Sequence, residues 1–420
     1  MKRLLYYMKE YKKESILGPL FKLLEASFEL LVPLVVANII DTGIASRDGG
    51  YVLKMGGVLI LLGFVGLASS ITAQYFAAKA AVGSSTAMRK ALFEHLNSFS
   101  YKELDTIGTS TLITRITSDI NQVQTGINLV LRLFLRSPFI VFGAMVMAFT
   151  IDMKAAAVFA GVVPVLFIVI FAIMGITIPW YRKVQSQLDR VLLHVRENLS
   201  GVRVVRAFNR QQEEMKTFHR DSTILMNTQL FVGRISGLLN PLTYAIINAA
   251  VILLVWTGGR QVDAGILSQG QVVALVNYMS QILVELIKLA NLIINVTKSL
   301  ACLSRINKIL DQEASMTEGT VEEQKQEKEV PCVEFKNVSI IYEEGADAAL
   351  SHVNFRAYPG ETIGVIGGTG SGKSTLVNLI PRFYDVSEGE VLVDGRNVQP
   401  FSPKAFLASK SMLRPVLAPT

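Results

Sequence analysis

The stretch that decides the fold is AAAVFAGVVPVLFIVIFAIMGITI, residues Ala155–Ile178, which contains no charged side chain. A helix needs about 20 mostly apolar residues to cross roughly 30 Å of hydrocarbon, so this segment is long enough to span a membrane. Three further stretches meet the same condition without a charge: Met55–Ala78, Ile235–Gly259 and Ala264–Val284. The sequence therefore predicts a multi-pass helical membrane protein.

Two weaker stretches bring the expected number of spans to six. Ser137–Ile151 is short but can be extended backwards from residue 136 to 128, and Ile16–Ile40 carries Lys22, Glu25 and Glu29. The expected spans are about 16–40, 55–78, 128–151, 155–178, 235–259 and 264–296. An even number places both ends of the chain on one side of the membrane. A bundle of four or five spans is the alternative.

The composition excludes an ordinary soluble protein. Only 18% of residues are charged, against about 25% in typical soluble domains, and the mean hydropathy is +0.40. The net charge of +7 does not indicate nucleic acid, because the basic residues do not cluster with aromatic ones. The cysteines, Cys302 and Cys332, lack the spacing of metal ligands. We expect both to be reduced and structural.

The distribution of Lys and Arg predicts the orientation of the chain. Basic residues concentrate in segments 1–13, 79–124 and 180–234, whereas the opposite connections hold only Arg47, Lys54, Lys154 and Arg260. Cytoplasmic connections carry the excess of Lys and Arg, so the N-terminus is expected to be cytoplasmic. A cell-membrane location follows.

The two basic connections are about fifty residues long and are expected to be helical. The second contains apolar residues at helical spacing, at Leu188, Leu192, Val195 and Leu199. The neighbouring spans should therefore continue into the cytoplasm as two long helical hairpins.

The character of the sequence changes after Leu310. Residues 1–310 form the expected membrane domain, and 311–330 is a charged linker rich in Glu, Gln and Lys. Residues 331–420 are expected to form a second domain. It contains a roughly alternating segment from Val333 to Val338 and a compact apolar run at Glu361–Ile366, both of which are expected to be strands.

A complete phosphate-binding motif follows that apolar run. The motif G-x-x-x-x-G-K-[ST] is matched by residues Gly367, Gly368, Thr369, Gly370, Ser371, Gly372, Lys373, Ser374 and Thr375. Glycines let the backbone curl so that successive N–H groups point at phosphate oxygens. Lys373 should reach the β- and γ-phosphates, and the Ser374 hydroxyl should bind Mg²⁺. A merely tight glycine-rich turn is the alternative.

Six spans, two long cytoplasmic hairpins and a phosphate-binding loop resemble an ABC exporter half-transporter of the bacterial multidrug and lipid exporter type. The similarity covers nearly the whole chain up to about Pro403. GTSTLITRITSD at Gly108–Asp119 resembles the family's first hairpin motif, with Arg115 and Asp119 matched. ENLSGVRVVRAF at Glu197–Phe208 resembles the second.

The resemblance implies a six-helix, all-α transmembrane domain followed by an incomplete α/β nucleotide-binding domain. It implies ATP and Mg²⁺ as cofactors, a second half-transporter as partner in a homo- or heterodimer, and a small amphipathic substrate. Residues 105–114 and 202–210 are expected to form the coupling helices that seat in nucleotide-binding domains. Tyr342 lies where the family's adenine-stacking aromatic residue is found; a surface tyrosine at a strand end is the alternative.

The family's later motifs are missing from the sequence. No glutamine loop, signature helix, Walker B segment or switch histidine follows Pro403, and Phe406–Thr420 does not resemble the expected continuation. We therefore expect a chain truncated by a frameshift or a premature stop, with no catalytic residue to assign and its ATPase activity undecided. A non-catalytic membrane subunit is the alternative to an active exporter subunit. A membrane-anchored P-loop kinase explains the hairpin motifs poorly.

Ionisable residues inside the spans give the only indication of a substrate. Lys22, Glu25 and Glu29 lie on one helical face, and Glu285 lies three residues before Lys288. Such groups usually face the interior of a bundle and pair with each other. They favour structural pairs, or positions in the cytoplasmic extensions of the helices, over the alternative of a cavity for cationic amphiphiles. The substrate stays open among drugs, lipids and peptides.

Overall fold

The computed structural model describes residues 2–313, 315–316, 330–342 and 347–399. The linker between 317 and 329 and the segment Phe406–Thr420 lie outside the described residues. The chain divides into two compact units, one of residues 1–85 with 123–300 and one of residues 86–122 with 301–420. Each unit is described by itself.

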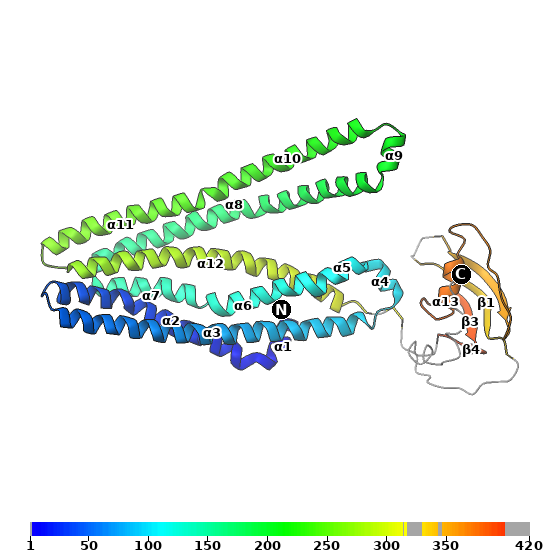
Figure 1. Cartoon of the computed structure of the whole chain (residues 1–420), viewed down its shortest axis with the longest axis horizontal. Coiled ribbons are helices and arrows are strands. Elements are labelled where there is room, and N and C mark those ends of the chain that lie inside the picture. The colour runs from blue at the N-terminus through cyan, green and yellow to red at the C-terminus, as the bar shows by residue number, and fades with distance from the viewer. Residues whose placement is uncertain (1, 314, 317–329, 343–346, 400–420) are drawn as a thin grey trace. The chain divides into compact units, whose positions relative to one another are not determined.

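Long helices make up the first unit (Figure 1). Six helical segments are long and apolar enough to cross a membrane, at Lys9–Ile44, Gly49–Leu96, Thr109–Ile151, Met153–Ser200, Gln211–Asp263 and Gln269–Leu310. The expected number of six spans is therefore confirmed, by the length and apolar composition of the helices. The helices of this unit are α1 (Lys2–Tyr7), α2 (Lys12–Asn38), α3 (Gly49–Leu96), α6 (Ile120–Leu133), α7 (Arg136–Ile151), α8 (Met153–Ser200), α9 (Val202–Ala207), α10 (Gln211–Gly237), α11 (Leu239–Asp263) and α12 (Gln269–Leu310), with α3 and α12 continuing into the second unit.

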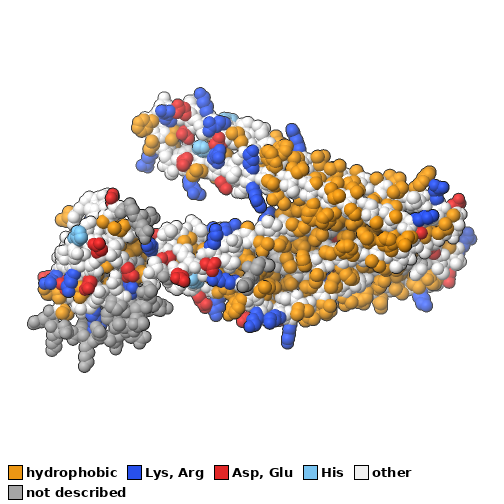
Figure 2. All heavy atoms as spheres, turned by 180° about the vertical axis from the view of Figure 1, so that it is seen from behind, with side chains coloured by type: hydrophobic (Ala, Val, Ile, Leu, Met, Phe, Trp, Pro, Cys, Tyr) orange, Lys and Arg blue, Asp and Glu red, His pale blue; other side chains and the backbone are white. Residues whose placement is uncertain are grey.

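The exterior of these helices is apolar where a membrane would surround them (Figure 2). Phe64 is 69% exposed and Trp256 is 69% exposed, which would be unfavourable in water but suits contact with lipid. Lys and Arg side chains gather toward the ends of the apolar zone. This distribution is the one expected for helices that traverse a bilayer.

The contacts between helices depend on small residues. Gly143 on α7 faces Leu30 on α2, and a Cβ atom at Gly143 would lie 2.4 Å from the Leu30 Cδ1 atom. Ala26 of α2 and Ala144 of α7 are both fully buried. Helices in a membrane associate by close packing, since lipid offers no hydrophobic drive between them. Small side chains therefore set how closely α2 and α7 approach.

One end of α2 is joined to the start of α12. A π-helical turn at Ile39–Ile44 continues α2 and carries Asp41. The Asp41 carboxylate accepts a hydrogen bond from the Gly270 backbone N–H at 2.7 Å and another from the Ser268 hydroxyl. A Cβ atom at Gly270 would lie 2.3 Å from the Ala37 carbonyl oxygen. Only glycine fits this joint, so the two helix ends are held together.

The second unit contains the C-terminal ends of α3 and α12 together with two short helices, α4 (Tyr101–Ile107) and α5 (Thr109–Thr114). Its remaining elements are β1 (Val333–Ile340), β2 (Leu350–Ala357), α13 (Lys373–Leu379), β3 (Glu388–Val393) and β4 (Arg396–Asn397). The strands form one antiparallel sheet in the order β2-β1-β3-β4. Phe335, Val338 and Leu379 build a small core between this sheet and α13.

The expected strand at Glu361–Ile366 is wrong. No strand is assigned to residues 361–366, and every residue of this segment is exposed. Ile366 is 99% exposed and Val365 is 45% exposed. The apolar run has the composition of a buried central strand, but a central strand needs neighbours on both edges to satisfy its backbone groups. The described sheet provides no strand that pairs with it.

Candidate nucleotide-binding site

The phosphate-binding motif forms a loop that leads into α13. Gly370 has a φ of 85° and Gly372 a φ of 81°, a region in which residues with a side chain are strained. A Cβ atom at Gly372 would lie 2.5 Å from the Ala349 carbonyl oxygen and 2.7 Å from the Leu350 Cδ2 atom. Glycine at this position therefore brings the loop against the start of β2. The curl expected from the motif is present.

Lys373 turns back onto the loop. Its ammonium group donates to the carbonyl oxygens of Gly367 at 2.9 Å and Gly368 at 2.7 Å. It also lies 3.3 Å from the Ser371 hydroxyl. The ammonium thus sits over the concavity that the motif would use for phosphate, held by oxygen acceptors that phosphate oxygens could replace. The residues present fit a polyphosphate.

The two hydroxyl residues after Lys373 have different surroundings. Ser374 is exposed at the first turn of α13, where it is free to meet a cation bound to phosphate. Thr375 is 9% exposed. No group of three or more His, Cys, Asp or Glu side chains among the described residues could hold a metal ion. A Mg²⁺ ion would therefore depend on the oxygens of the nucleotide together with Ser374, as is usual for magnesium.

Tyr342 lies next to the loop, just after the end of β1. Its hydroxyl donates to the Thr375 hydroxyl oxygen at 3.1 Å. Its ring meets the Tyr384 ring edge-on, with 5.0 Å between centroids. Tyr342 therefore reaches the phosphate-binding helix through its hydroxyl. Adenine stacking on its ring stays a prediction.

Tyr384 is a site residue that the sequence analysis missed. Its hydroxyl donates to the Asp105 carboxylate of α4 at 2.5 Å. Burial and this hydrogen bond to Asp105 raise the pKa of Tyr384, so the phenol keeps its proton. The neighbouring Phe383 ring lies 4.4 Å from the Tyr101 ring, also on α4. The only signal in the sequence was the aromatic pair at 383–384 after the P-loop helix.

The first hairpin meets the nucleotide-binding region through α4. The expected coupling helix at 105–114 covers the end of α4, the bend at Gly108 and all of α5. The contacts to Phe383 and Tyr384 come from Tyr101 and Asp105. The contacting helix therefore begins earlier in the chain than the sequence indicated. Its first turn is capped by Ser100 and Glu103, a capping box that the sequence analysis did not identify.

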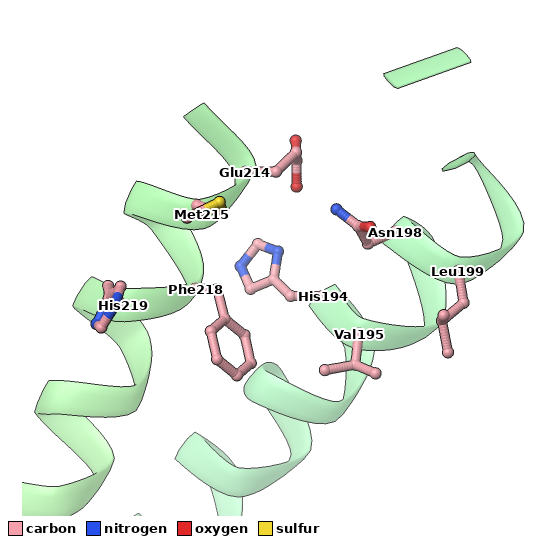
Figure 3. Close-up of a pocket in the computed structure, with 8 residues that line it drawn as sticks. All are labelled: His194, Val195, Asn198, Leu199, Glu214, Met215, Phe218 and His219. Atoms are coloured by element: carbon pink, nitrogen blue, oxygen red, sulfur yellow. The ribbon is translucent and has the colours of Figure 1, made fainter. Parts of the chain in front are cut away.

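The second hairpin consists of α8, α9 and α10. The short helix α9 lies within the expected segment 202–210 and has no buried residue. His194 projects from α8 toward α10 into a hollow of about 330 Å³ (Figure 3). Its Nε2 atom lies 3.0 Å from a carboxylate oxygen of Asp221, whose side chain is 7% exposed. This pair links the two long helices near the tip of the hairpin.

Two family models match the chain. The model described as "ABC transporter transmembrane region" matches residues 15–286, and the model described as "ABC transporter" matches residues 350–415. The second match extends past Pro403, where the resemblance was expected to end. It includes the phosphate-binding loop, α13, Tyr384 and β3.

Curated relatives cover most of the chain. A Bacillus subtilis protein called "Uncharacterized ABC transporter ATP-binding protein YfiB" is 32% identical over 400 residues, which are 95% of this chain and 69% of the relative. The "ATP-dependent lipid A-core flippase" of Hahella chejuensis is 28% identical over 95% of this chain and 68% of its own length. A "Probable multidrug resistance ABC transporter ATP-binding/permease protein YheH" from Bacillus subtilis is 28% identical over 74% of this chain and 46% of its own length.

These matches agree with six apolar helices followed by a phosphate-binding loop on a small mixed α/β region. The family implies nucleotide binding and, for a half-transporter, assembly into a dimer. The transmembrane-region model matches residues 15–286, which is more than half of the chain. The chain therefore belongs to the ABC transporter family, as a half-transporter of the bacterial exporter type.

Proposed function

We propose that the chain is one subunit of a dimeric exporter that uses ATP to move a small amphipathic substrate across the cell membrane. The observation that carries the proposal is the loop at Gly367–Thr375, with Lys373 over its concavity and Tyr342 beside it. In this proposal the loop amides and Lys373 hold the phosphates, Ser374 binds Mg²⁺, and Tyr342 stacks on adenine. Drugs, lipids and peptides all remain within the substrate class.

The membrane domain supports the direction of transport that we propose. In this proposal the connections rich in Lys and Arg are cytoplasmic, and the nucleotide-binding region lies on the same side of the membrane. A partner half-transporter, identical or different, would complete the assembly.

The test is ATP-dependent accumulation of a fluorescent amphiphile in inside-out vesicles that contain the chain. We expect Lys373→Ala to abolish the ATP-dependent part, because the lysine neutralises phosphate charge. Leu379→Val serves as the control, since it changes a buried side chain of α13 away from the loop. Accumulation that is equal in wild type and Lys373→Ala would contradict the proposal.

A second candidate follows from the exposed segment 361–366. Because Val365 and Ile366 are exposed beside the loop, the chain could act as a membrane subunit that holds nucleotide only when assembled with an intact partner. Radiolabelled ATP binding to the purified chain distinguishes the two functions. Saturable binding that Lys373→Ala removes favours the active subunit, whereas binding that needs a co-expressed relative favours the second.

A further inference from the structure

The helix α12 carries a polar face within the membrane-spanning part of the first unit. Asn277 and Ser280 are exposed, and Gln281 and Lys288 are half-buried. These residues are spaced so that they fall on one side of the helix. Amide and charged groups that face hydrocarbon are costly, and such residues normally border protein or a water-filled path. This face of α12 is therefore unsuited to lipid, unlike the face of α11 that exposes Trp256.

A hollow of about 420 Å³ opens between this face and α2. The volume lies in the range of sites for small molecules. Its apolar wall includes Val32, Pro33 and Val36 of α2 and Val284 of α12. Its polar lining consists of Glu29, Asn277, Ser280, Gln281, Glu285 and Lys288. The hollow thus has an apolar wall that could contact the hydrocarbon part of an amphiphile and polar groups that could contact its headgroup.

A neutral network of charges lies behind the hollow. Arg136 of α7 donates to Glu285 at 2.6 Å and to Glu29 at 2.5 Å. Lys288 donates to Glu285 at 2.8 Å, and Lys22 donates to Glu25 at 2.5 Å. Three cationic side chains thus face three carboxylates, so the formal charges cancel. A ligand with a single net charge gains no overall attraction from this network.

Two members of the network are open to the hollow. The side chains of Glu29 and Lys288 are 40% and 41% exposed, whereas those of Arg136 and Glu285 are 8% and 3% exposed. Glu29 and Lys288 both line the hollow. The Oε1 atom of Gln281, also in the lining, is buried and accepts no hydrogen bond within the described part of the chain. The hollow therefore offers one carboxylate, one ammonium group and one unused acceptor.

We propose that this hollow binds a zwitterionic amphiphile, with the ligand's cationic group at Glu29, its anionic group at Lys288 and its apolar body against the valines. The inference rests on the proposed export function, because it identifies the hollow as part of the substrate path. A simple cation in the hollow would lie beside the like charge of Lys288, and a simple anion would lie beside the like charge of Glu29. Only a ligand with both charges satisfies both open groups.

The test measures equilibrium binding to the full chain, purified in the neutral detergent dodecyl maltoside. The probe is radiolabelled N-dodecyl-N,N-dimethylglycine, which carries a quaternary ammonium and a carboxylate on one alkyl tail. Dodecyltrimethylammonium and dodecanoate share the tail and carry one charge each. We expect the zwitterion to bind about tenfold more tightly than either, because it adds one contact between opposite charges, worth about 1.4 kcal/mol.

Two substitutions assign the binding to the hollow. Glu29→Gln and Lys288→Gln should each weaken binding of the zwitterion about tenfold. Glu29→Gln should favour dodecanoate over dodecyltrimethylammonium, and Lys288→Gln should favour the reverse. Glu285 keeps Arg136 and Ser137 as partners in both variants, so the network itself persists. Arg260→Gln and Asp263→Asn, which change a basic and an acidic residue lining a separate hollow on α11, are matched controls and should leave binding unchanged.

Competition distinguishes the sources of such a ligand. Displacement of the probe by lysophosphatidylethanolamine indicates a lipid substrate, and displacement by a free-ended apolar tripeptide indicates a peptide. The proposal is overturned if the cation binds as tightly as the zwitterion, if the α11 variants weaken binding as much as Glu29→Gln does, or if no saturable binding occurs. None of these results affects the export proposal, which fails only if ATP-dependent accumulation is insensitive to Lys373→Ala.

Discussion

The two helical hairpins differ in where their side chains find partners. In the first, Asp119 accepts hydrogen bonds from Arg305 of α12 at 2.6 and 3.0 Å and from Arg115 at 2.8 Å. His95 of α3 lies 3.1 Å from the Ile309 carbonyl oxygen and 3.0 Å from that of Gln312, so its ring N–H reaches the end of α12. The first hairpin is therefore tied to other parts of its own chain.

The second hairpin leaves its apolar tip uncovered. Leu199, Val204 and Phe208 are 72%, 60% and 74% exposed. The His194–Asp221 pair joins α8 to α10 but holds neither helix to another part of the chain. The difference suggests that the first hairpin folds with its own chain, whereas the second presents a surface for a partner.

The largest effect should follow from removing the carboxylate that holds the first hairpin. Asp119→Ala leaves Arg305 and Arg115 without their shared acceptor. We expect local stability to fall by about 2 kcal/mol. This loss is smaller than the cost of breaking a fully buried pair, because Arg305 is partly exposed. Amide hydrogen exchange of residues 301–310 measures the loss.

The matching control is Asp189→Ala, on the exposed side of the second hairpin. Its effect on exchange should stay within about 0.5 kcal/mol. Equal effects of the two substitutions would show that the first hairpin is not held as the structure indicates.

A smaller effect is expected at the pair inside the second hairpin. Asp221→Ala removes the acceptor for His194, and we expect a loss of about 1.5 kcal/mol. The helices α8 and α10 should then separate near the tip, which limited proteolysis at residues 201–210 detects. If cleavage is as slow as in the wild type, packing alone holds the hairpin and the pair contributes nothing measurable.

The cap of α4 should contribute less again. Ser100 and Glu103 form a capping box, and the Glu103 carboxylate also accepts a hydrogen bond from the Ser315 N–H at 3.2 Å. Ser100→Ala should lower the free energy required to open α4 by about 1 kcal/mol. Exchange of the amides of residues 101–107 reports it, with Thr106→Ala as a control near the other end of the helix.

The same cap predicts how α4 responds to pH. Burial alone would raise the pKa of Glu103, but hydrogen bonds from Ser100 and Ser315 outweigh it and the pKa is lowered from 4.5. A carboxyl whose pKa is lower in the folded state stabilises that state above its unfolded pKa and loses this contribution as pH falls through the folded value. Protection of α4 should therefore decline below about pH 4.5, and Glu103→Gln should remove the dependence.

The smallest effect on stability is expected at the uncovered tip. Phe208→Ser removes a side chain with no intramolecular support, so the stability of the second hairpin should change by less than about 0.5 kcal/mol. Self-association in detergent, measured by analytical ultracentrifugation, should instead weaken by about tenfold. An unchanged dimer would mean that the exposed tip is not the partner surface.

Features that depend on local sequence could be predicted. The spans followed from uninterrupted apolar runs such as Ala155–Ile178, and the phosphate-binding loop from residue types at fixed spacing. The curl at Gly370 and Gly372 agrees with what that spacing requires. In both cases the decisive interactions join residues close together in the chain.

Features that depend on distant partners could not be predicted. The acidic residues Glu29 and Glu285 were identified, but their shared partner Arg136 lies on a third helix, and periodicity along one helix gives no sign of it. Tyr384 was missed for the same reason, since its partner Asp105 precedes it by 279 positions. The expected strand at Glu361–Ile366 failed because strand formation depends on neighbouring strands as well as composition.

The joint at Asp41 has a mechanical consequence. Because Gly270 has no room to slide past Ala37, we expect any motion of α12 at this end to be a pivot rather than a translation. From Gly270 to Leu300 the helix extends about 45 Å, at about 1.5 Å per residue. A pivot of about one degree at the joint therefore displaces the far end of that stretch by about 0.8 Å, and Glu285 and Lys288 by about half as much. Gly270 is therefore the fixed point about which α12 would tilt.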